Sequence, residues 1–262
     1  MTDLAMQPSA LRSGPDANRS ERADRRFYVW MAGIFVLIAF GGFIPTYWAK
    51  LAAGTFGGAP VLHIHGALFF AWTLFFFMQT ALVASGRTPD HRAWGLAGIS
   101  LATAMCISVL LGAINSMRVA ESIGMADAAR RFSIVSLGNL LLFAAFFCAA
   151  IINVRRSAVH KRLMIAAMIP LMHAATARVF MVLFAPPGQA GPPPVFVSVP
   201  PAICVDLLLV AAMVHDWRSR GKPHPVYLIC GALLLANQLL AIPISGTGAW
   251  MAVATWVQHL AG

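Results

Sequence analysis

Seven apolar stretches, each long enough to cross a lipid bilayer, constrain this chain more than any other feature of its sequence. A membrane-spanning helix needs about 20 apolar residues, because each residue adds about 1.5 Å across a hydrocarbon core about 30 Å thick. The stretches cover residues 27–48, 60–84, 93–115, 133–154, 160–184, 195–217 and 226–246. We therefore predict an all-α integral membrane protein, a bundle of seven transmembrane helices.

Composition and charge agree with a membrane protein. The chain is 59% hydrophobic and only 11% charged, whereas soluble domains are about 25% charged. Its net charge is +10. In membrane proteins an excess of Lys and Arg is concentrated in cytoplasmic loops beside anionic lipid, so we expect membrane lipid as a partner and not nucleic acid. With the N-terminus cytoplasmic, fourteen Lys and Arg flank the spans on the inner side and four on the other. This bias predicts a cytoplasmic N-terminus and a C-terminus outside.

The flanking segments complete the expected domain organisation. Residues 1–26 carry few large apolar side chains, which predicts a disordered cytoplasmic tail. Residues 27–247 form the seven-helix transmembrane domain. Residues 248–262 are too short to cross and contain two tryptophans, so we expect a short interfacial C-terminal segment.

Several polar side chains fall inside the apolar stretches. His173 and Arg178 lie in the fifth and Asp206 lies in the sixth. A charge in hydrocarbon normally finds a partner, so we expect Asp206 to pair with Arg178 or to hydrogen-bond His173, in a structural or a functional role. The amides that could join this buried polar site are Asn139, Asn237 and Gln238.

A stripe of three residues marks the second span. His65, Trp72 and Gln79 recur at seven-residue spacing, which keeps them on nearly the same helix face. The stripe is consistent with a polar site and also with ordinary helix packing. Two further histidines, His91 and His160, stand at the inner ends of the third and fifth spans at matching depth.

Two segments, HIHGALFFAWTLFFFMQTALVASGRTPDHRAWG and HKRLMIAAMIPLMHAATARVF, carry a family resemblance. They resemble bacterial multi-pass membrane proteins of the domain of unknown function 2306 family over residues 60–184. The resemblance implies a multi-pass protein of the bacterial inner (cytoplasmic) membrane, with no established reaction. The matching positions are His65, Gln79, His91, Arg92, Gly95, His160, Met164 and Arg178.

The chain is also similar, more weakly, to b-type membrane cytochromes, in which histidines on neighbouring helices ligate haem. That similarity implies haem b held by two pairs, His65 with His173 outside and His91 with His160 inside. On a rise of 1.5 Å per residue, the outer pair differs in depth by about 8 Å, whereas the inner pair matches.

Three functional hypotheses follow. The first is a haem- or metal-binding membrane redox protein that uses His65, His91, His160 and His173, with no metal beyond haem iron. The second is a proton-coupled transporter or carrier with a site of His173, Arg178 and Asp206. The third is a non-catalytic membrane assembly or sensing protein. The sequence does not identify a redox or small-molecule partner.

Overall fold

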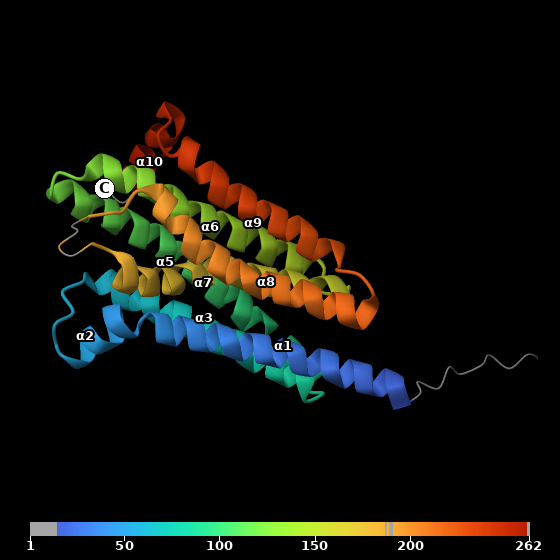
Figure 1. The fold of residues 1–262 in the computed structure, drawn as a ribbon. Coiled ribbons are helices and arrows are strands. Elements are labelled where there is room, and N and C mark those ends of the chain that lie inside the picture. Colours follow the sequence, from blue (N-terminus) through green and yellow to red (C-terminus); the bar gives the residue numbers. More distant parts are fainter. Residues whose placement is uncertain (1–14, 187, 189–190, 261–262) are drawn as a thin grey trace, which may run out of the picture.

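The computed structural model describes residues 15–186, 188 and 191–260. In this part of the chain every regular element is a helix (Figure 1). Within the described ranges, seven helical segments are long and apolar enough to cross a membrane, which confirms the predicted multi-pass, all-α architecture. The elements are α1 Pro15–Gly42, η1 Ile44–Trp48, α2 Ala49–Ala52, α3 Pro60–Ala84, α4 Thr88–Ala93, α5 Gly95–Ser122, α6 Ala126–Ile152, α7 Ser157–Phe184, η2 Val195–Ser198, α8 Val199–Arg220, α9 Pro225–Ile244 and α10 Gly248–His259.

The first helix departs from the expected boundary at residue 27. Residues 1–14 of the predicted disordered tail lie outside the described residues, whereas residues 15–26 form the first turns of α1. The other end of this span bends: after Gly42 the chain makes the π-helical turn η1, with Pro45 near its start. Single π turns in a helix are frequent at functional sites.

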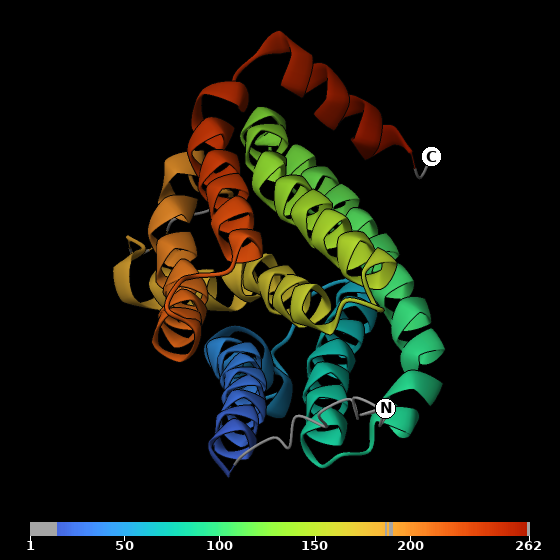
Figure 2. The same cartoon turned by 90° about the vertical axis from the view of Figure 1, so that its right-hand side faces the viewer.

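Helix α7 lies at the centre of the bundle. It packs against α1, α6, α8 and α9 and is the most buried of the seven spans. Figure 2 shows α7 (olive) between α1 (blue) and α9 (red-orange). The fully buried Ala166 and Ala167 permit close helix approach at this position, as small residues do in membrane bundles. Polar groups such as Arg162 and His173 on α7 are therefore withdrawn from solvent.

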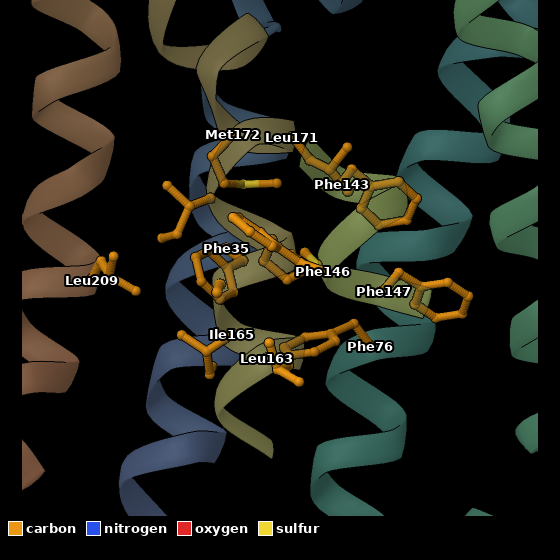
Figure 3. Close-up of a cluster of buried hydrophobic side chains, with 14 of the residues drawn as sticks. Phe35, Phe76, Phe143, Phe146, Phe147, Leu163, Ile165, Leu171, Met172 and Leu209 are labelled. Carbon is orange, nitrogen blue, oxygen red and sulfur yellow. The ribbon is translucent and has the colours of Figure 1, made fainter. Parts of the chain in front are cut away.

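Aromatic side chains fill the space between α7, α6 and α3 (Figure 3). Phe143 and Phe147 stack on α6 with ring centroids 5.7 Å apart. Both meet the ring of Trp72 edge-on, at 5.6 and 5.5 Å. The indole N–H of Trp72 donates to Sδ of Met168 on α7 at 3.3 Å. Trp72 is thus a core residue whose polar atom is satisfied within the bundle.

The segment after α9 forms the short helix α10, which packs against α5 and α6. Thr247 caps it by accepting a hydrogen bond from the backbone N–H of Trp250. The indole N–H of Trp250 donates to the carbonyl oxygen of Arg130 at 2.9 Å. Helix α10 is therefore anchored to one end of the bundle, the end at which α7 finishes.

Candidate functional site

His91 and His160 lie next to each other at the end of the bundle where α7 begins. We call this end, with the last turn of α3, helix α4 and the first turns of α7, the His160 end. The two ring centroids are 6.3 Å apart and the ring planes make an angle of 72°. The sequence placed His91 at the start of the third span, but it stands on the separate helix α4. The expected inner pair is brought together.

Both imidazoles are anchored through Nδ1. Nδ1 of His91 lies 3.1 Å from Oε1 of Gln79, an acceptor, and Nδ1 of His160 lies 2.9 Å from the carbonyl oxygen of Ala150. Because these oxygens only accept, both rings carry their proton on Nδ1. Among the described residues, none hydrogen-bonds either Nε2. A ring N–H fixed by an oxygen, with the other nitrogen open, is the usual arrangement of a metal-binding histidine.

The protonation of His91 suits this role. Burial lowers the pKa of His91 below its ordinary value of 6.5, and the nearby His160 and Arg92 lower it further, while the bond to Gln79 opposes the shift. A histidine whose pKa is lowered is neutral at pH 7. The neutral imidazole is the form that coordinates a metal.

The two histidines of the expected outer pair have different partners. Nε2 of His173 donates to the carbonyl oxygen of Ser198 at 2.9 Å, and its Nδ1 accepts from Nδ2 of Asn139 at 3.1 Å. Oδ1 of Asn139 accepts in turn from Asn237 at 3.4 Å. His65 bonds instead to Oγ of Ser108 at 3.1 Å. Both nitrogens of His173 are therefore engaged, and this residue does not fit a haem ligand in the observed arrangement.

Asp206 does not pair with Arg178, contrary to expectation. Oδ2 of Asp206 accepts from Nε2 of Gln238 on α9 at 2.9 Å. Oδ1 of Asp206 and Oε1 of Gln238 are buried and have no hydrogen-bond partner in the part of the chain that the structure describes. A cavity of about 10 Å³ adjoins them, which is room for about one water molecule. The residues that line it are Asn139, Ile169, Pro170, His173, Ala202, Val205, Asp206, Leu234 and Gln238.

Arg178 points to another part of the bundle. Its guanidinium carbon lies 5.5 Å from the ring centroid of Phe43, at the junction of α1 and η1. In the described residues no carboxylate lies within ion-pair distance of it. The pairing prediction was wrong because Asp206 contacts α9, whereas Arg178 contacts the end of α1.

The stripe on α3 serves three separate contacts. His65 bonds α5 through Ser108, and Trp72 bonds α7 through Met168. Gln79 bonds the ring and the backbone carbonyl oxygen of His91. Equal spacing thus placed these side chains on one helix face, but only Gln79 belongs to the histidine pair.

Sequence reasoning missed a fully buried ion pair. Arg162 and Asp216 are both 0% exposed, and two nitrogens of Arg162 donate to the two carboxylate oxygens at 2.7 and 2.5 Å. The count of Lys and Arg beside the spans treats Arg162 as an interfacial charge, because it lies near the start of a span. The acidic Asp216, four residues from the end of α8 and at matching depth, was the available signal.

A second ionic cluster surrounds this pair. Asp24 on α1 accepts hydrogen bonds from Lys161, from Nε2 of His215 at 3.1 Å and from Arg220 at 3.2 Å. The ring of His215 stacks on Phe27 with centroids 3.9 Å apart. These contacts tie α1, α7 and α8 together at the His160 end.

The fold and these sites define a polytopic, all-helical membrane protein with ionisable groups inside its bundle. The chain matches none of the protein-family models, and no curated protein or solved structure is significantly similar to it. The resemblance to the domain of unknown function 2306 family stays a prediction. The functional argument therefore rests on the geometry of the side chains.

Proposed function

We propose that this protein is a membrane redox protein that holds one haem-type iron between His91 and His160. The observation that carries the proposal is the pair itself: two neighbouring imidazoles, each anchored through Nδ1, each with an open Nε2. The two ring centroids are 6.3 Å apart, which is near enough for one bound group to contact both imidazoles.

The number of ligands favours haem over an isolated metal ion. Structural zinc sites take four protein ligands and catalytic ones three. In the described part of the chain, no group of three or more His, Cys, Asp or Glu side chains is placed to hold a metal ion. Haem iron needs only axial ligands from the protein, because the porphyrin supplies the other four. Bound haem would supply one-electron transfer.

The protein's own residues would orient the ligands. The amide oxygen of Gln79 accepts from the ring N–H of His91, and its amide nitrogen donates to the backbone carbonyl oxygen of the same residue. The carbonyl oxygen of Ala150, near the end of α6, fixes the ring of His160. We place the His160 end on the cytoplasmic side of a bacterial inner membrane, where the Lys and Arg bias predicts it. An electron donor or acceptor would then approach from that side.

An absorption spectrum tests this proposal. Protein purified from haem-replete cells should show a Soret band and sharpened visible bands after dithionite reduction. His91→Ala and His160→Ala should each lose most of this signal, whereas His63→Ala should keep it, because His63 bonds Tyr47 at the opposite end of the bundle. A colourless, iron-free protein would overturn the proposal, and so would full haem content in both alanine variants.

A second candidate function, a proton-coupled carrier, is favoured by Asp206. An ionised carboxylate without a cation is costly in hydrocarbon, and such groups mark ion or proton pathways. A proton on Oδ1 of Asp206 would remove the charge and would turn this unpartnered oxygen into a hydrogen-bond donor. The adjoining water-sized cavity lies between four polar side chains: Asn139, His173, Asp206 and Gln238.

Infrared spectroscopy tests the carrier proposal without a known substrate. Membranes of the wild-type protein should show the C=O stretch of a protonated carboxylic acid, which should change with pH. Asp206→Asn should lose this band, and Asp90→Asn, which alters an exposed ion pair with Arg87, should keep it. A band unchanged in Asp206→Asn would remove Asp206 from any proton pathway.

A further inference from the structure

Arg178 has three properties that are typical of a binding site for an anionic ligand. It is half-buried, it lies in the last two turns of α7, and in the described residues no carboxylate pairs with it. An arginine in the apolar part of a membrane normally contacts an anion, a carbonyl or water. Its position is also far from the histidine pair, since 18 residues of α7 correspond to about 27 Å.

Backbone packing fixes the surroundings of Arg178. A Cβ atom on Gly42 would lie 2.5 Å from the carbonyl oxygen of Ala175, so α1 and α7 touch backbone to backbone there. Phe43 follows Gly42, and Arg178 stands one turn after Ala175. The contact of the guanidinium with the Phe43 ring, at 5.5 Å, is therefore set by the helix crossing. The arginine is positioned by the fold and is not a free surface side chain.

Two further polar atoms in this region, one on Thr46 and one on His65, have no hydrogen-bond partner among the described residues. Oγ1 of Thr46 in η1 is buried without a hydrogen bond, and η1 packs against α7. His65 lies in the second turn of α3, and Phe70, further along the same helix, contacts Phe43, so His65 is at the same end of the bundle. The hydroxyl of Ser108 donates to the carbonyl oxygen of Met105, so Nδ1 of His65 donates to Ser108 and its Nε2 stays open. The site offers a forked cation, a hydroxyl and an imidazole.

We infer that Arg178, Thr46 and His65 bind an oxyanion, a phosphate or carboxylate group, that enters from the membrane face where α7 ends. A guanidinium fork matches the two oxygens of such a group. The group can come from the headgroup of an anionic phospholipid or from a soluble anion. Aromatic rings of η1 and its neighbours, Phe40, Phe43, Tyr47, Trp48 and Phe70, form the apolar wall beside the site.

Two binding measurements on the purified full chain test this inference. Inorganic phosphate is titrated against tryptophan fluorescence in detergent, and native mass spectrometry counts phosphatidylglycerol retained from mixed vesicles. We expect one of the two ligands to bind the wild type and to bind Arg178→Gln about 10- to 100-fold more weakly, as expected for lost charge-assisted hydrogen bonds. Phosphate binding would identify a soluble anion, and lipid retention alone would identify a headgroup.

Matched variants separate a built site from general charge. Lys50→Gln removes an exposed cation near the same end of the bundle and should leave binding unchanged. Thr46→Val keeps the shape and removes only the hydroxyl, so it should weaken binding severalfold even if Arg178→Gln fails to fold. Equal loss of binding in Lys50→Gln and Arg178→Gln would overturn the inference, and so would a wild-type protein that binds neither ligand. Full affinity in the Thr46→Val variant and also in an Arg178→Gln or Arg178→Lys variant would overturn it as well.

Discussion

The charged residues near the two ends of α7 differ in whether they have partners of opposite charge. At the His160 end, Arg162 and Asp216 form a two-point ion pair with no exposure, and Asp24 accepts from three basic side chains. Further along the bundle, Arg178 faces a phenyl ring, and Asp206 and Gln238 keep oxygens without donors. Because an unpaired buried polar group costs free energy, satisfied charges are suited to holding helices together. Unsatisfied ones are suited to binding a ligand or proton.

The largest expected effect is on the satisfied pair. Asp216→Asn leaves Arg162 buried without a counter-charge and should destabilise the protein by about 3–5 kcal/mol. Removing both charges in Arg162→Met/Asp216→Leu should recover much of this loss. Thermal unfolding in detergent measures both. Additive losses in the double variant would show that the pair does not act as a unit.

Arg178→Gln should destabilise the protein much less than Asp216→Asn does, because the two arginines differ in their partners. The variant loses a cation–π contact worth about 1 kcal/mol and no ion pair among the described residues. We expect its melting temperature to stay close to that of the wild type in the same detergent. A loss as large as that of Asp216→Asn would mean that Arg178 is a structural charge, and the two regions would no longer differ.

Gln79→Leu tests whether the histidine pair is a binding site or a packing contact. The change removes the acceptor that holds Nδ1 of His91 and should weaken haem binding about 10- to 100-fold. Haem titration of the apo protein measures this affinity. Thr80→Val, at the neighbouring position, removes only a hydroxyl that bonds its own helix backbone, and it should bind haem normally. Unchanged affinity in Gln79→Leu would place Gln79 outside the site.

The smallest effect is a pH dependence from His91. Its pKa is lowered by burial from the ordinary 6.5, so the unfolded chain takes up this proton at a higher pH than the folded protein does. The corresponding stability is present above pH 6.5 and is lost as the pH falls below it. Melting temperatures of apo wild type and His91→Gln, compared across pH 6.5, isolate this contribution. Parallel curves would contradict it.

The sequence predicted the spans well because length and apolar composition alone determine membrane crossing. It also predicted that His91 and His160 match in depth, since both stand beside span ends. It could not predict which helix faces meet. Asp206 and Arg178 therefore appeared to be partners, although Asp206 contacts α9 and Arg178 contacts Phe43. The sequence did not predict the burial of Arg162. Counting charges near span ends does not distinguish a solvated arginine from one that has a partner on another helix.

The central claim, that two imidazoles share one iron at the His160 end, is tested most directly by electron paramagnetic resonance of the oxidised protein. Two axial imidazoles give low-spin ferric haem, so the wild type should show a low-spin signal. His91→Ala, which keeps His160 as one ligand, should convert any remaining haem to a high-spin signal. A wild-type signal that is high-spin, or a low-spin signal that survives in His91→Ala, would contradict the shared site.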